Sequence, residues 1–176
     1  MDKIIQCFIQ GPEKEFYVRE IAKKLKKSPT TISKYLKVYE KEGILISSKK
    51  LNHLLFQANF KSRKYKNLKL NYNFNSISDS GLLDFLIEEY NYPEAIILFG
   101  SFAKAENSSK SDIDILIVSP SNKKVNLGKF EKKLSLEIQL FIHSVKDIEK
   151  LKKTNKELFN SWVNGITLFG NWEAIK

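Results

Sequence analysis

The sequence predicts an α+β protein with two domains, residues 1–75 and residues 76–176. The division follows charge: the first segment holds 17 Lys and Arg against 6 Asp and Glu, and the second holds 13 against 14. The basic segment contains short amphipathic helices, whereas the second contains apolar runs typical of buried strands. A basic surplus confined to one segment is typical of a module that binds a polyanion. Lysines that merely solvate the surface would be spread evenly.

Three helices are predicted near the N-terminus from apolar spacing and from helix-end residues. Apolar side chains recur on one side of residues 4–9 and 19–26, which predicts two short helices. A third helix begins at Ser28-Pro29, because serine is a favoured N-cap and proline fits the first helical turn. It ends before Gly43, since glycine readily adopts the left-handed conformation that follows many helices.

Two segments with alternating apolar residues follow, residues 44–47 and 54–60. They are predicted to pair as strands around a turn at Lys49-Lys50-Leu51-Asn52. Three helices followed by such a hairpin predict a winged helix-turn-helix. Beyond the hairpin, residues 61–69 are interpreted as a basic connector. Residues 71–80, rich in Asn and Ser, are interpreted as the domain boundary.

The third helix leaves hydroxyl and lysine side chains on its open face. Such side chains suit the major groove and its flanking phosphates, and the lysines of the hairpin suit phosphates as well. We therefore expect the first domain to bind duplex DNA; a protein-interaction module is the alternative. The expected DNA-binding residues are Thr30, Thr31, Ser33, Lys34, Lys37, Lys49 and Lys50.

The second domain carries a Gly-Ser pair and two acids between apolar runs. Gly100-Ser101 ends the run at residues 95–99, and Asp112-Ile113-Asp114 opens the next run. On a strand the two aspartates share one face, about 6.6–7 Å apart, an arrangement that suits Mg²⁺. The Gly-Ser turn leads into a short helical segment, whose first N–H groups favour a phosphate. These features together indicate phosphoryl or nucleotidyl transfer. The alternative is an ordinary turn followed by solvated acids at a strand edge.

The order Gly-Ser, ten residues, Asp-x-Asp resembles the minimal nucleotidyltransferases of the DNA polymerase β superfamily, over about residues 78–172. The resemblance implies a small mixed sheet flanked by helices. It also implies binding of a nucleoside triphosphate such as ATP, with one or two Mg²⁺ ions, and release of pyrophosphate. Asp112 and Asp114 would bind the metal and act in catalysis. The expected nucleotide-binding residues are Gly100, Ser101, Lys104 and Ser111.

The sequence departs from the family pattern at three positions. Lys104 and Ala105 stand where family members often have arginine and glycine; lysine keeps the charge, and alanine restricts the backbone only modestly. The strand at residues 136–142 would normally carry a third carboxylate, which activates the attacking hydroxyl. Gln139 falls at that position, and an amide cannot act as a general base. Glu137, one strand step away, is the expected substitute.

The remaining sequence features indicate the cellular compartment of the protein and its other helices and strands. Cys7 lies among apolar residues and is expected to be a buried structural thiol in a reducing cytoplasm. No signal peptide and no run of about 18 apolar residues is found, so we expect no membrane association. Helices are expected at residues 82–90, 145–153 and 157–164, and a short strand at 166–169.

Two functions follow from these observations. The leading hypothesis is an enzyme that transfers a nucleotidyl group, AMP from ATP, to a hydroxyl on an unidentified acceptor. The family resemblance implies that such domains often act with a small helical partner protein, as in toxin–antitoxin pairs; a homodimer is the other assembly considered. The second hypothesis, favoured by Gln139, is a transcriptional regulator whose second domain senses nucleotide without catalysis.

Overall fold

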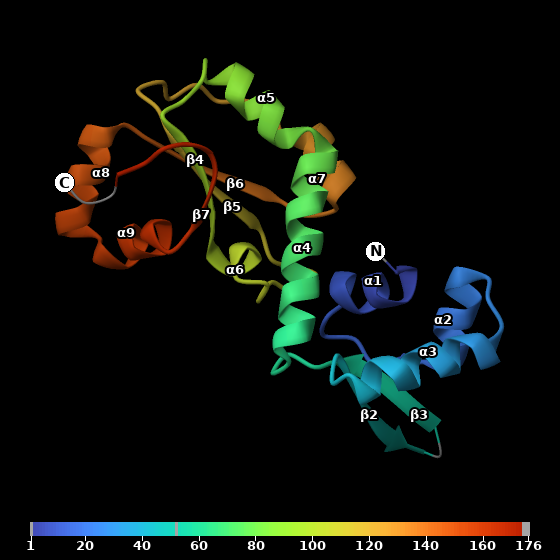
Figure 1. Cartoon of the computed structure of the whole chain (residues 1–176). Helices are drawn as coiled ribbons and strands as arrows, with labels where there is room; N and C mark the ends of the chain where they lie inside the picture. Colours follow the sequence, from blue (N-terminus) through green and yellow to red (C-terminus); the bar gives the residue numbers. More distant parts are fainter. Residues whose placement is uncertain (1, 52, 174–176) are drawn as a thin grey trace. The chain divides into compact units, whose positions relative to one another are not determined.

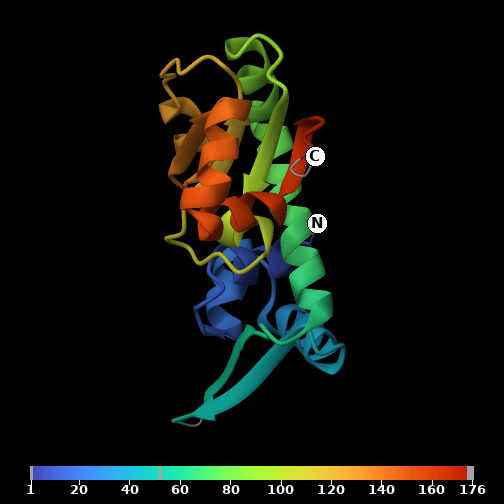
Figure 2. The same cartoon turned by 90° about the vertical axis from the view of Figure 1, so that its left-hand side faces the viewer.

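The structure is a computed structural model that describes residues 2–51 and 53–173 (Figures 1 and 2). The chain divides into two units, Met1–Tyr72 and Asn73–Lys176. Each unit has its own sheet and its own buried core, and each is described by itself below.

The three N-terminal helices begin and end close to the residues that the sequence predicts. Ser28 caps the third helix, since its Oγ accepts a hydrogen bond from the Thr31 N–H at 3.1 Å. Gly43 follows that helix with φ +72°, a conformation in which glycine lacks the steric cost of a Cβ. The three helices are α1 (Lys3–Gln10), α2 (Val18–Leu25) and α3 (Pro29–Lys41).

The sheet of the first unit is antiparallel, with strand order β1-β3-β2. The expected four-residue turn is wrong, because Lys49 and Lys50 belong to β2 and pair with Leu54 and His53. A tight turn therefore begins at Leu51, which has φ +45°. Asn52, also expected in the turn, lies outside the described residues. The strands are β1 (Phe16–Tyr17), β2 (Leu45–Lys50) and β3 (His53–Ala58).

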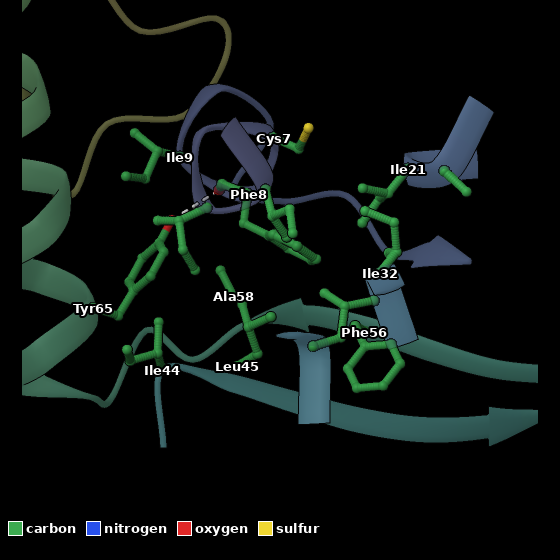
Figure 3. Close-up of a cluster of buried hydrophobic side chains, with 14 residues drawn as sticks. Cys7, Phe8, Ile9, Ile21, Ile32, Ile44, Leu45, Phe56, Ala58 and Tyr65 are labelled. Carbon is green, nitrogen blue, oxygen red and sulfur yellow. Dashed lines mark hydrogen bonds between the residues drawn. The ribbon is translucent and has the colours of Figure 1, made fainter. Parts of the chain in front are cut away.

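The core of the first unit lies between the helices and the sheet (Figure 3). Phe8, Ile32 and Phe56 are fully buried there. Tyr65 joins this core from a fourth helix, and its hydroxyl donates a hydrogen bond to the Phe8 carbonyl at 2.9 Å. Cys7 is buried as expected, and burial raises the pKa of its thiol above the usual range.

The fourth helix, α4 (Arg63–Ser80), corrects the sequence analysis. Residues 61–69 were expected as a connector and 71–80 as a polar boundary, but nearly all of both segments is one helix of 18 residues. Its apolar residues are too sparse to form a continuous stripe, so no periodic signal marks it. α4 contributes Tyr65 to the core of the first unit and Ile77 to a core of the second.

The second unit contains a mixed sheet with strand order β6-β5-β4-β7, as the family resemblance implies. β5 and β6 run parallel, whereas β4 is antiparallel to both of its neighbours. β4 is buried along its whole length because helices cover both faces of the sheet. The strands are β4 (Ala95–Phe99), β5 (Ile113–Val118), β6 (Ile138–His143) and β7 (Ile166–Gly170).

Two layers of helices sandwich this sheet (Figure 1). On one face Phe99 packs with Trp162, which is 1% exposed and belongs to the core. On the other face Ile113 packs in a core with Phe130 of α7, a short helix that was not predicted because it buries only that one residue. The helices are α5 (Leu82–Glu89), α7 (Gly128–Leu134), α8 (Val145–Thr154) and α9 (Lys156–Val163).

Candidate active site and nucleic-acid interface

Gly100 lies directly against the carboxylate of Asp114. Gly100 follows β4 with φ +70°, and Asp114 is the β5 partner of the preceding residue, Phe99. A Cβ placed on Gly100 would lie 2.2 Å from Asp114 Oδ2. Both the backbone conformation and the available space therefore require glycine at this position.

The two aspartates form a pair of like charges at the start of β5. Asp114 is half-buried, whereas Asp112 precedes the strand and is exposed. Burial, and then the charge of Asp112, raise the pKa of the Asp114 carboxyl above its usual range. A divalent cation would relieve both effects, so the donor set fits Mg²⁺.

The short helical segment expected after the apolar run begins at Gly100 itself. α6 (Gly100–Ala103) is a single helical turn. The Ser101 carbonyl accepts hydrogen bonds from the N–H groups of Lys104 and Glu106, at 3.2 and 2.9 Å. N–H groups in a first helical turn have no acceptor within the helix, so local N–H donors rather than a long helix dipole would hold a phosphate here.

Of the two other expected nucleotide-binding residues, Lys104 directly follows α6 and Ser111 lies in the loop before β5. Lys104 is exposed and precedes Ala105, which is buried and has φ +54°. Glycine adopts this left-handed conformation at a lower steric cost than alanine does. Ser111 closes the loop before Asp112, because its Oγ accepts a hydrogen bond from the Ser108 N–H at 2.9 Å.

Gln139 occupies the place beside Asp114 on the next strand. The two residues are register partners in the parallel β5–β6 pair, so their side chains share one face. Glu137 precedes β6, and its carbonyl accepts a hydrogen bond from the Ile113 N–H at 2.9 Å. Within the described part of the chain, no group of three His, Cys, Asp or Glu side chains is arranged to hold a metal ion. Glu137 therefore does not complete a three-carboxylate set with Asp112 and Asp114.

The residues expected to bind DNA lie on α3 and on β2 in the first unit. All of them are exposed except Ser33, which is half-buried. Two have partners within the protein: the Thr31 hydroxyl lies 2.7 Å from Ser28 Oγ, and Lys50 forms an ion pair with Glu15 at 2.7 Å. The Lys34 and Lys37 side chains are exposed on α3.

Comparison with known families agrees with this geometry. Residues 83–173, more than half of the chain, match the family model described as polymerase beta, nucleotidyltransferase. The chain belongs to this nucleotidyltransferase family. Residues 3–47 match the family model described as bacterial regulatory protein, arsR family. The predicted fusion is thus confirmed: an ArsR-type helix-turn-helix DNA-binding domain precedes the nucleotidyltransferase domain. No curated protein and no solved structure gives a significant match.

Asn73, the first residue of the second unit, is a buried polar residue that the sequence did not point to. Its side-chain amide donates hydrogen bonds to the Phe102 carbonyl at 2.8 Å and to Asn107 Oδ1 at 3.0 Å. Asn73 and Asn107 are both buried. No sequence pattern links α4 to the loop before β5, so these hydrogen bonds of Asn73 could be found only from the structure.

No helix within residues 2–51 and 53–173 has the length and apolar content needed to cross a membrane.

Proposed function

We propose that the protein binds a nucleoside triphosphate with Mg²⁺ and transfers its nucleotidyl group to a hydroxyl acceptor. The observation that carries this proposal is the contact between the Gly100 backbone and the Asp114 carboxylate. That contact supports a phosphate-binding turn next to a metal-binding pair of aspartates. Membership of the nucleotidyltransferase family supports the same assignment.

Each residue of the site has a chemical role in this proposal. Asp112 and Asp114 hold the metal, and N–H groups of the turn at Gly100 and Ser101 hold phosphate oxygens, with Lys104 adding positive charge. Bound Mg²⁺ neutralises phosphate charge and orients the triphosphate. The acceptor oxygen bonds to the α-phosphorus, pyrophosphate leaves, and Glu137 takes the proton of the hydroxyl.

A second candidate function is nucleotide sensing without transfer. The register of Gln139 with Asp114 favours it, because an amide lies where the family pattern has a carboxylate. In this case the domain binds Mg–ATP and the ArsR-type domain acts as a transcriptional regulator. Both candidates use the same nucleotide site, and they differ only in turnover.

For the first domain we propose duplex DNA as the ligand, bound by α3 and by the lysines of β2. Exposed lysines on α3 and the match to a bacterial regulatory family support this assignment. DNA and nucleotide are both found in the cytoplasm, where we place the protein. A small helical protein is the partner we propose for the transferase, as acceptor or as toxin–antitoxin counterpart, with a homodimer as the other assembly.

The test is metal-dependent nucleotide binding by the full chain. Labelled ATP is titrated with and without Mg²⁺ into the wild type and into Asp112→Asn and Asp114→Asn. The wild type should bind only with Mg²⁺, and each variant should lose most of this binding, because each removes a charged oxygen ligand. Equal binding in all cases would remove the site assignment for both candidate functions.

A further inference from the structure

α4 is hydrogen-bonded to the first helix by two tyrosines. The Tyr65 hydroxyl donates to the Phe8 carbonyl at 2.9 Å (Figure 3). The Tyr72 hydroxyl accepts a hydrogen bond from the side-chain amide of Gln10 at 2.7 Å. The Phe8 carbonyl and the Gln10 amide both belong to α1, so these two hydrogen bonds connect α4 to α1.

The next residue along α4, Asn73, is hydrogen-bonded to the nucleotide-binding segment instead. Its amide nitrogen donates to the carbonyl of Phe102, which lies in α6 beside Ser101. The same nitrogen donates to Asn107 Oδ1, in the loop that leads to Asp112. Asn73 is 2% exposed, so neither bond has water as a ready replacement. A shift of the loop backbone must therefore either break a buried hydrogen bond or move the Asn73 side chain with it.

We propose that Asn73 is a positioning residue for the nucleotide site, and that it couples occupancy of this site to DNA binding through α4. The inference rests on the proposed function, because it requires that the chain binds both nucleotide and DNA. A triphosphate held at Gly100 and Ser101 shifts the α6 backbone, and the bond from Phe102 to Asn73 transmits that shift to α4. Tyr72, the neighbouring residue, transmits it to α1.

Such coupling is reciprocal and can be measured in both directions. A fluorescein-labelled DNA duplex of mixed sequence is titrated with the full chain, with and without saturating Mg²⁺ and an ATP analogue that cannot release pyrophosphate. Free Mg²⁺ and ionic strength are held constant. We expect the DNA dissociation constant to change by at least about fivefold. The nucleotide dissociation constant should change by the same factor when DNA is saturating.

Two variants test the residues that carry the coupling. Asn73→Asp keeps the shape of the side chain but removes both N–H donors. It should weaken binding of the Mg²⁺–analogue complex by about tenfold, as expected when buried hydrogen bonds are lost, and abolish the coupling. Tyr72→Phe leaves the nucleotide loop untouched, so it should bind the analogue normally yet show reduced coupling. DNA binding without nucleotide should stay within about twofold of wild type in both, since neither residue belongs to the expected DNA contacts.

Asn75→Ala is the matched control, because Asn75 is exposed on the same helix. It should keep both affinities and the full coupling. Full coupling in Asn73→Asp or in Tyr72→Phe would overturn the proposed route, and the Tyr72→Phe result stands even where the Asn73 variant does not fold. A wild type that binds both ligands with no mutual effect would overturn the coupling alone. A wild type that fails to bind nucleotide or DNA would overturn the proposed function as well.

Discussion

At the residue scale, the site depends on one glycine and one half-buried aspartate. Gly100 supplies a left-handed backbone and an absent side chain, and Asp114 fills the space that a side chain would take. The Asp114 carboxylate is also half-buried and near the charge of Asp112, and burial, followed by that charge, raises its pKa. The site therefore costs stability when no cation is bound, and several consequences can be measured.

Gly100→Ala should abolish Mg–ATP binding, since the new Cβ collides with Asp114 Oδ2 and displaces the carboxylate. The positive φ adds about 1–2 kcal/mol of strain. Gly81→Ala is a matched control: Gly81 has φ +79° but nothing lies within 4 Å of its Cβ position. Gly81→Ala should be destabilised by a similar backbone strain, which thermal unfolding measures. It should keep the wild-type affinity for Mg–ATP, which ATP titration measures. Normal ATP binding by Gly100→Ala would contradict the site.

Asp114→Asn should raise the melting temperature of the metal-free protein near neutral pH. The raised pKa means that the folded state binds the Asp114 proton more tightly than the unfolded chain does. The protonated carboxyl therefore stabilises the fold at low pH, and this stabilisation is lost as pH rises from the unfolded pKa, about 3.9, through the folded value. The difference in melting temperature between Asp114→Asn and the wild type should therefore disappear at acid pH. A lower melting temperature for Asp114→Asn at neutral pH would contradict the charge argument.

Glu137→Gln separates the two candidate functions. If Glu137 accepts the hydroxyl proton, its removal should lower transfer by about 10²–10⁴-fold, the usual contribution of a general base, with little change in ATP affinity. Incorporation of labelled AMP into protein or RNA, with candidate partners present, is the measurement. Gln139→Glu is the companion variant, which restores a carboxylate beside Asp114 and should increase transfer. Undiminished transfer by Glu137→Gln would exclude Glu137 as the base, and absent turnover in the wild type would favour the sensor.

At the scale of elements, helices with an apolar stripe were predictable, and one long helix without such a stripe was not. Ser28, Pro29 and Gly43 bracket α3, and the structure uses each of them as the sequence predicts. Gly100-Ser101 and Asp112-Ile113-Asp114 likewise lie within short stretches of sequence, so the sequence alone could propose them as a candidate nucleotide site. α4 has comparable end residues, because Ser62 Oγ accepts a hydrogen bond from the Tyr65 N–H at 3.3 Å and Gly81 follows the helix with φ +79°, but it has no apolar stripe. The bonds of Asn73 join residues about 30 positions apart, and only tertiary structure brings such residues together.

α3 should bind DNA chiefly through phosphates. If about six Lys and Arg side chains contact phosphates, affinity should fall by about 10³-fold between 50 and 200 mM salt. Lys34→Ala and Lys37→Ala should each weaken binding and reduce the slope of log affinity against log salt by about one. Asp112→Asn, in the other unit, is the control and should leave DNA affinity unchanged. The measurement is anisotropy of a labelled duplex at several salt concentrations, and binding independent of salt would refute the phosphate contacts.

At the scale of the whole molecule, α4 is expected to couple the unfolding of the two units. Its residues belong to both cores, so melting this helix removes buried contacts from each. Both tryptophans, Trp162 and Trp172, belong to the second unit, and their fluorescence therefore reports that unit alone. Far-ultraviolet circular dichroism reports helices in both.

We therefore expect the fluorescence and circular-dichroism unfolding transitions to coincide. Mg–ATP should shift both upward, since ligand at about 100 times its dissociation constant stabilises the bound state by about 2.7 kcal/mol. Asp114→Asn, which should not bind Mg–ATP, is the control and should show no ligand-dependent shift. Two separate transitions, or a shift seen by fluorescence alone, would show that α4 does not join the stabilities of the two units.

The boundary between Tyr72 and Asn73 has a consequence for how this gene can be rearranged. Fusion proteins are commonly joined by loops, where a break leaves both partners whole. Here the break falls inside a helix of 18 residues, and each half is shorter than the roughly 12–15 residues that an isolated helix needs to persist in water. A recombination event or a protease that divides the chain at this point would leave a frayed helical end on both products. The regulator-like half and the nucleotidyltransferase half are therefore expected to be gained, kept and lost together.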